Sequence, residues 1–80
     1  MAVTILFLGP LRDLAGGASR DVAAPLDWSG LLDNVGEDLA DVLKGERIHV
    51  ALSGKVLIDK AALYAADGDE VALLPPVSGG

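Results

Sequence analysis

Apolar residues alternate near both ends of the chain, in the pattern that predicts β-strands. Residues 3–8 form an apolar or β-branched run that stops at Gly9-Pro10, and residues 70–74 form a second run after the turn Asp67-Gly68-Asp69. Successive side chains of a strand point to opposite faces. One face is therefore predicted to pack on a helix, with the residues Val3, Ile5, Phe7, Val71 and Leu73. The other face is predicted to carry Leu6, Leu8, Ala72 and Leu74.

Shorter apolar runs predict the remaining strands. Residues 20–24 form a strand that Pro25 stops, residues 48–53 alternate again, and residues 56–58 return after a Gly54-Lys55 turn. Residues 61–66 are predicted to form a connecting helical turn that contains Leu63.

The middle of the chain has a helical period. Apolar residues recur there at spacings of three and four, which is typical of one buried helix face: Trp28, Leu31, Leu32, Val35, Leu39, Val42 and Leu43. Asp27 is a good N-cap residue. Gly36 is predicted to divide the helix into two segments, because glycine is unfavourable inside a helix.

The order of these elements predicts the fold class. Two strands, a helix, two strands, a turn and a last strand give an α+β fold, with one main helix packed on one face of a mixed sheet. The first and last strands are the most apolar, so they are predicted to lie at the centre. A β-grasp domain over residues 1–74 is the natural solution.

Composition and charge narrow the function. The formal net charge is −6, which disfavours binding to phosphate backbones. The chain has no cysteine, which excludes disulfides and thiolate chemistry. It shows neither a signal peptide nor an apolar run long enough to cross a membrane, so a cytoplasmic location is expected.

No metal site is predicted. His49 is the only histidine, and its position opposite the core face of its strand indicates a surface residue. The acidic residues Asp67, Asp69 and Glu70 lack a full set of cation ligands and are better explained by a turn followed by a strand.

The last six residues, 75–80, are predicted to form an extended tail: Pro75, Pro76, Val77, Ser78, Gly79 and Gly80. Proline has no N–H for a sheet ladder and pushes the preceding residue toward extended conformations. Six residues reach about 20 Å at roughly 3.3 Å each. The two glycines make the end narrow, so the tail can enter the active site of another protein.

The chemical group that such a tail presents is the carboxylate of Gly80. A carboxylate is ionised at neutral pH and is a poor electrophile. Activation as an acyl-adenylate would allow attack, and exchange of one oxygen for sulfur would then give a nucleophilic thiocarboxylate. The other interpretations are an incidental glycine-rich terminus and a cloning scar.

Both ends of the chain resemble the small subunit of molybdopterin synthase, a ubiquitin-like sulfur carrier. The similarity lies in residues 67–80, from the acidic turn to Pro-Pro-Val-Ser-Gly-Gly, and in the opening strand and arginine-containing turn of residues 3–16. The Gly54-Lys55-Val56-Leu57 segment, with Leu63 six residues after Leu57, is similar to the ubiquitin hairpin. Leu73 and Leu74 stand where the family often has aromatic residues, Ser53 stands where it often has asparagine, and Gly9-Pro10 is unusual for its opening turn.

The resemblance implies a function in molybdenum cofactor biosynthesis. A ubiquitin-activating-type enzyme would use ATP to adenylate Gly80, and a sulfur donor would convert the adenylate to a thiocarboxylate. The tail, residues 75–79 and Gly80, would then enter the large synthase subunit and donate sulfur for the dithiolene of molybdopterin. Two small and two large subunits would form a heterotetramer. The chain would bind no cofactor and would have no catalytic side chain of its own.

Four residues are predicted to contact the large subunit: Leu6, Leu8, Arg12 and Leu74. Arg12 matches the family's basic turn residue and is either a partner contact or a solvated charge. Three other functions stay open at this point: a sulfur carrier for thiamine or another pathway, a ubiquitin-like modifier of lysines, and a plain binding module.

Overall fold

The computed structural model describes residues 2–45 and 47–75. Its main sheet has five strands in the order β2-β1-β7-β4-β5, and a small second sheet pairs β3 with β6. The strands of the main sheet are β1 (Ala2–Phe7), β2 (Ser19–Ala23), β4 (His49–Leu52), β5 (Lys55–Val56) and β7 (Glu70–Leu74). The others are β3 (Leu26–Asp27) and β6 (Tyr64–Ala65). The helices are α1 (Leu11–Ala15), α2 (Trp28–Val35), α3 (Glu37–Leu43) and the short 3₁₀ helix η1 (Lys60–Ala62).

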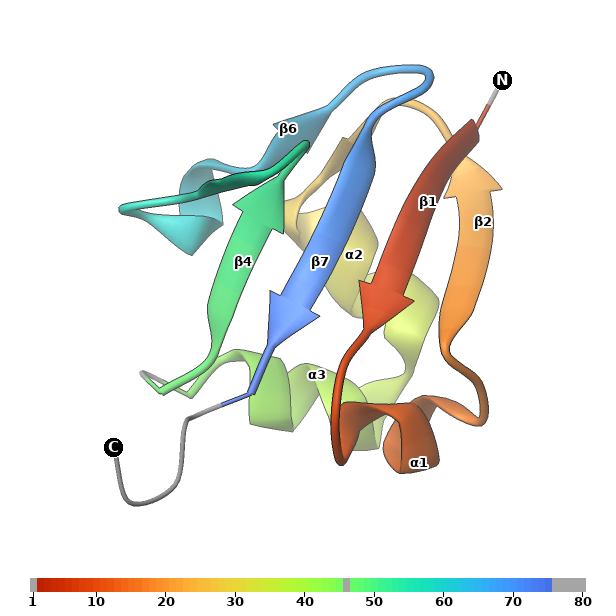
Figure 1. Cartoon of the computed structure of the whole chain (residues 1–80), viewed down its shortest axis with the longest axis vertical. Helices are drawn as coiled ribbons and strands as arrows, with labels where there is room; N and C mark the ends of the chain where they lie inside the picture. The colour runs from red at the N-terminus through yellow and green to blue at the C-terminus, as the bar shows by residue number, and fades with distance from the viewer. Residues whose placement is uncertain (1, 46, 76–80) are drawn as a thin grey trace.

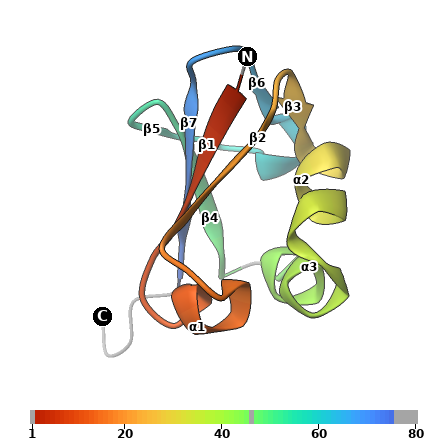
Figure 2. The same ribbon diagram turned by 90° about the vertical axis from the view of Figure 1, so that its right-hand side faces the viewer.

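The first and last strands lie together in the middle of the main sheet, as the sequence predicts. β7 runs parallel to β1, with Phe7 opposite Leu73, and antiparallel to β4. Figure 1 shows β7 between these two neighbours. A mixed sheet of this kind, with α2 and α3 together on one face, is the β-grasp arrangement, and Figure 2 shows these helices on one side of the sheet.

The core lies between that sheet face and the helices. The five strand residues predicted to face the helix are at most 1% exposed: Val3, Ile5, Phe7, Val71 and Leu73. Leu31 of α2 and Leu39 and Leu43 of α3 complete the cluster from the helix side. Alternation along β1 and β7 thus correctly separates the core face from the opposite face.

The main helix is divided as the sequence predicts. The Asp27 carboxylate accepts a hydrogen bond from the Gly30 N–H at 2.7 Å and caps the start of α2. Gly36, at φ +89°, separates α2 from α3. Because few L-residues adopt this φ, a glycine at this position allows the chain to change direction while both helices stay on the sheet.

Two predictions about residues 56–66 are wrong in detail. The return strand is Lys55–Val56 and not residues 56–58, because the turn is Ser53-Gly54 and Lys55 already pairs with Leu52. Beyond the strand, the Leu57 N–H still donates to the Val50 carbonyl at 2.8 Å. The predicted helical turn is only the 3₁₀ helix η1, and it is followed by strand β6. β6 pairs with β3, and pairs of two-residue strands have no periodicity that the sequence could reveal.

No helix among the described residues has the length and apolar character needed to span a membrane.

The acidic turn before β7 holds three segments together. Asp69 accepts hydrogen bonds from the Ala66 N–H at 2.8 Å and from the Ser53 hydroxyl at 3.1 Å. Asp67 accepts one from the Ala2 N–H at 3.0 Å. The turn therefore ties the start of β7 to both β1 and the β4–β5 hairpin.

We expect Asp69→Ala to lower the free energy of unfolding by about 1–2 kcal/mol, because it removes two hydrogen bonds to a charged acceptor. Urea unfolding of the purified protein measures the change. Asp41→Ala, at an exposed position of α3, is the matched control and should change stability by less than about 0.5 kcal/mol. Equal stability of the two variants would show that the Asp69 bonds contribute nothing.

Candidate functional site

The central strand β7 ends where the predicted tail begins. Val71 and Leu73 are fully buried, so β7 is anchored in the core up to one residue before its end. β7 ends at Leu74, where Pro75 begins, and a proline cannot donate to the next position of the ladder. Pro75 itself is half-buried. The root of the predicted tail is therefore fixed to a central strand whose core-facing side chains are fully buried.

The remaining predicted tail residues lie outside the described residues: Pro76, Val77, Ser78, Gly79 and Gly80. Their roles stay predictions.

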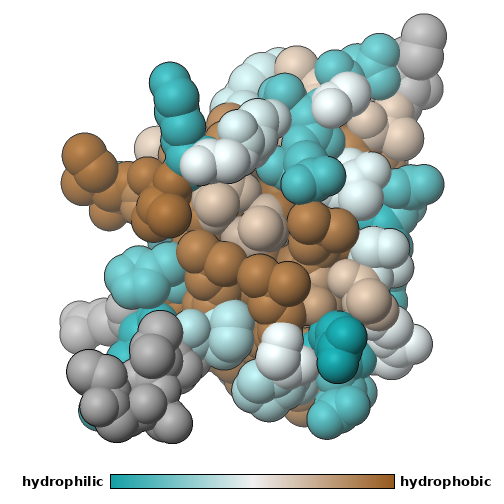
Figure 3. Space-filling model, viewed as in Figure 1, coloured by the Kyte–Doolittle hydropathy of each residue, from teal (hydrophilic) through white to brown (hydrophobic). Residues whose placement is uncertain are grey.

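Beside the tail root, one face of the sheet has no helix on it among the described residues. Cross-strand partners share a face, and the pairs Leu6–Ala72, Ala72–Ala51 and Ala51–Val56 connect four strands across this side. We call this side of the sheet the open sheet face and define it by the residues Leu6, Ala51, Val56, Ala72 and Leu74, of which Ala51 is buried at 7% exposure. Figure 3 shows apolar surface over the central strands on this side.

The open sheet face and the predicted partner surface share some residues but not all. Leu6 and Leu74 are half-buried and lie on it, as predicted. β1 ends at Phe7, so strand alternation does not place Leu8, which is 39% exposed. Ala51 and Val56 were missed, although the hairpin Ser53-Gly54 sets the register that places Val56 opposite Ala51. Val56 is 58% exposed and extends the apolar surface to the edge strand.

Arg12 lies on α1 with an exposed side chain. Its carbonyl accepts hydrogen bonds from the Gly16 N–H at 2.9 Å and the Gly17 N–H at 3.1 Å, which fixes the backbone. Arg12 and Asp13 line a shallow cavity of about 390 Å³ with the glycine-containing loop that follows. The side chain is accessible to a partner, and its role in binding stays a prediction.

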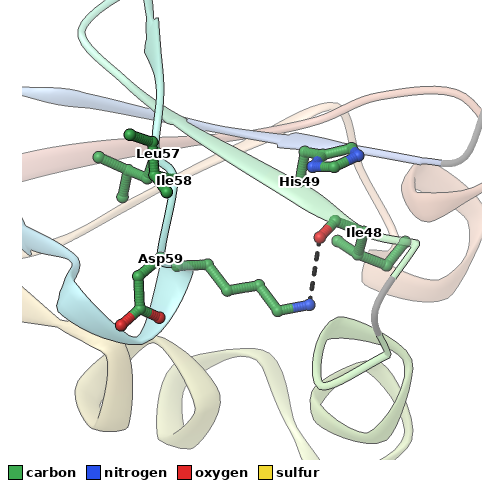
Figure 4. A pocket seen from close by; sticks show the side chains of 6 residues that line it. Ile48, His49, Leu57, Ile58 and Asp59 are labelled. Carbon is green, nitrogen blue, oxygen red and sulfur yellow. Dashed lines mark hydrogen bonds between the residues drawn. The ribbon is translucent and has the colours of Figure 1, made fainter.

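A second cavity, of about 240 Å³, lies between β4 and the segment before η1. Lys60 lines this cavity, and its Nζ donates a hydrogen bond to the Ile48 carbonyl oxygen at 3.1 Å, which is the dashed line in Figure 4. The Lys60 ammonium also donates to the Gly45 carbonyl and lies 5.8 Å from the centre of the Trp28 ring. Lys60 therefore holds the loop after α3 against η1, which is a structural role.

His49 is exposed and pairs with Leu74, which places it at the border of the open sheet face. Figure 4 shows the Asp59 carboxylate pointing away from the His49 ring. Within residues 2–45 and 47–75, no cluster of three or more histidine, cysteine, aspartate or glutamate side chains could hold a metal ion.

These features define a class of protein. A β-grasp body, a central strand that ends just before Pro75 and is followed in the sequence by a predicted tail with two terminal glycines, and an apolar sheet face beside Pro75 are those of a ubiquitin-like carrier. The chain belongs to the ThiS family of such sulfur carriers, since the family model matches residues 5–80.

Solved structures agree with this assignment. The chain is 29% identical to subunit 1 in the complex of subunits 1 and 2 of molybdopterin-converting factor from Helicobacter pylori, with a TM-score of 0.67 and 100% of both chains covered. It is 25% identical to the small archaeal modifier protein SAMP1 from Haloferax volcanii, with a TM-score of 0.70 and 100% of both chains covered. SAMP1 from Methanosarcina acetivorans, at 21% identity, shares the fold with a TM-score of 0.73 over 99% of this chain and 96% of that one. No curated protein sequence matches this chain.

Proposed function

We propose that this chain is the sulfur-carrier subunit of a molybdopterin synthase, with the Gly80 carboxylate as its working group. One observation carries the proposal: the central strand β7, anchored in the core, ends just before Pro75 beside the open sheet face, and only five residues then follow Pro75 to the end of the sequence at Gly79-Gly80. A fixed root and an apolar surface next to it are what a protein needs in order to deliver its C-terminus to a partner. The similarity to subunit 1 of the Helicobacter pylori complex supports a large synthase subunit as that partner.

The chemistry begins with an adenylating enzyme of the ubiquitin-activating type. The Gly80 carboxylate attacks the α-phosphorus of ATP, and pyrophosphate leaves. A sulfide-level nucleophile from the sulfur donor then attacks the acyl carbon, and AMP leaves with the bonding electron pair. The thiocarboxylate sulfur then attacks a carbon of a pterin precursor in the large subunit and displaces an oxygen leaving group. Water attacks the Gly80 acyl carbon of the resulting thioester, the acyl C–S bond breaks, and the sulfur stays on the pterin while Gly80 returns to a carboxylate. We place this step within an assembly of two small and two large subunits. We place this ATP-dependent cycle in the cytoplasm.

Intact-mass measurement of the protein isolated from its native cell tests the proposal. We expect a fraction of the molecules to be heavier by about 16 Da, because sulfur replaces one terminal oxygen. Oxidation gives a similar increment, so the sample is also treated with a thiol-directed alkylating reagent. The chain has no cysteine, which leaves the thiocarboxylate as the expected target.

The matched control is the same protein from cells that lack the adenylating enzyme, which should carry the unmodified mass and resist alkylation. An alkylation-resistant increment, or an unmodified mass in both cell lines under conditions of active cofactor synthesis, would contradict the carrier proposal.

The similarity to SAMP1 from Haloferax volcanii favours a second candidate function, a ubiquitin-like modifier whose C-terminus is joined to lysines. Both functions begin with the same adenylate and differ in the nucleophile that follows. Isopeptide-linked products found by peptide mass spectrometry in the same cells would favour the modifier.

A further inference from the structure

The turn between β1 and α1 forms a fixed structure next to the tail root. The Leu11 N–H donates to the Leu8 carbonyl at 3.2 Å, and the Arg12 N–H donates to the Gly9 carbonyl at 3.1 Å. Leu11 is 2% exposed, so the turn is also anchored in the core. Pro10, with φ −63°, further limits the freedom of the turn.

This turn meets the tail root because of the register of the two central strands. β1 and β7 are parallel, and Phe7 pairs with Leu73. Gly9 and Pro75 each lie two residues after this pair, so they are neighbours at the same edge of the sheet. Figure 1 shows both arrows pointing to the end of the molecule where α1 lies.

Gly9 and Pro75 are close enough that a side chain on Gly9 would press on the proline ring, which would have to shift by a few tenths of an ångström. A Cβ atom on Gly9 would lie 3.3 Å from Pro75 Cγ, which is tighter than most real Cβ contacts. Gly9 also has φ +57°, a conformation that asparagine tolerates better than most other L-residues. Backbone conformation alone would thus allow asparagine at position 9, whereas the contact with Pro75 favours glycine.

We propose that Gly9 is a positioning residue that lets the Pro75 ring rest against the β1–α1 turn, and that this contact sets the direction in which the tail leaves the domain. The inference rests on the proposed carrier function. The ring fixes φ at Pro75, and Pro76 restricts Pro75 itself to extended conformations, so a contact that orients Pro75 limits the directions open to the chain after it. Five further residues reach at most about 17 Å, and a small rotation at the root therefore displaces Gly80 by much more.

The test is the activation of Gly80 by the adenylating enzyme from the same cell, measured as ATP–pyrophosphate exchange. We expect Gly9→Asn to lower kcat about tenfold, because misplacing a reacting group by about 1 Å can cost about 100-fold and a smaller displacement costs less. KM should change less than about twofold, because the open sheet face, which we expect to dock, is unaltered. Gly68→Asn is the matched control: Gly68 has φ +86°, and a Cβ there meets nothing within 4 Å.

A second comparison isolates the contact itself. Pro75→Ala removes Cγ, so adding Gly9→Asn to Pro75→Ala should lower kcat by less than about twofold, as expected when the partner of an interaction is already gone. The same tenfold loss in both backgrounds, or an equal loss in Gly68→Asn, would overturn the inference. Gly9→Ala gives the same comparison with less bulk if Gly9→Asn folds poorly.

The failure of this inference is distinguishable from failure of the proposed function. Wild-type protein that supports no pyrophosphate exchange would remove the carrier function. The contact is then tested by NMR, in which we expect a nuclear Overhauser effect between the Gly9 Hα protons and the Pro75 ring. Its absence in the wild type would overturn the inference without any reference to activity.

Discussion

Removing Gly80, or adding one glycine after it, should lower sulfur transfer at least about 100-fold, because a reacting group misplaced by one residue leaves the near-attack geometry. One residue of extended chain spans about 3.3 Å, which is far more than an active site tolerates. The free energy of unfolding should stay unchanged, since β7 ends at Leu74 and the core is complete before the tail begins.

The measurement is a single-turnover assay in which thiocarboxylated protein and the large subunit convert the pterin precursor, with urea unfolding run on the same samples. One glycine added at the N-terminus is the matched control for chain length and should leave both quantities unchanged. Deleting Val77 separates tail length from terminal sequence, because it shortens the tail but keeps the diglycine end. Full transfer by the Gly80 variants would remove the carrier hypothesis, and full transfer by the Val77 deletion would show that tail length is not the controlling feature.

The main layers of this fold could be predicted from the sequence because long-period patterns encode them. Alternation in β1 and β7 identified which residues face the helices, and Gly36 identified where the main helix divides. The β3–β6 sheet was missed because two residues are too few to show alternation. The apolar residues Leu57 and Ile58 were wrongly predicted to continue a strand. Their apolar character has other causes or none in the fold, because Leu57 packs against the core and Ile58 is fully exposed.

The chemistry assigned to the candidate site is a prediction from the sequence alone, and the geometry around the tail root could be predicted only in part. The diglycine end and Pro75-Pro76 are local signals that can be read directly. The extension of the open sheet face through Ala51 and Val56 depends on hairpin register. The approach of Gly9 to Pro75 depends on parallel pairing between the two ends of the chain, so only the folded structure reveals it.

We expect Leu74→Asp to weaken binding to the large synthase subunit by about 2–4 kcal/mol, the size of effect seen for central interface residues. This corresponds to a Kd at least about 30-fold higher. Leu74 lies on the open sheet face at the tail root, so a partner that receives the tail has to cover it. An aspartate there would be buried without a counter-charge in the complex, which is costly. In the free protein Leu74 is only half-buried, so the carboxylate keeps access to water and the domain should lose much less stability.

Titration calorimetry of each variant with the large subunit, together with urea unfolding of the variant alone, tests this expectation. Val42→Asp is the matched control, because Val42 is an apolar residue, 38% exposed, on α3 in the helix layer opposite the open sheet face. It introduces the same charge and should leave Kd within about twofold, as is usual for a position outside the interface.

Equal weakening of binding by both variants would indicate a general effect of charge. Unchanged affinity of Leu74→Asp with a large loss of stability would place Leu74 in the core and move the docking surface elsewhere. Selective weakening by Leu74→Asp, with stability retained, is the result that would identify the open sheet face as the surface that docks before Gly80 is delivered.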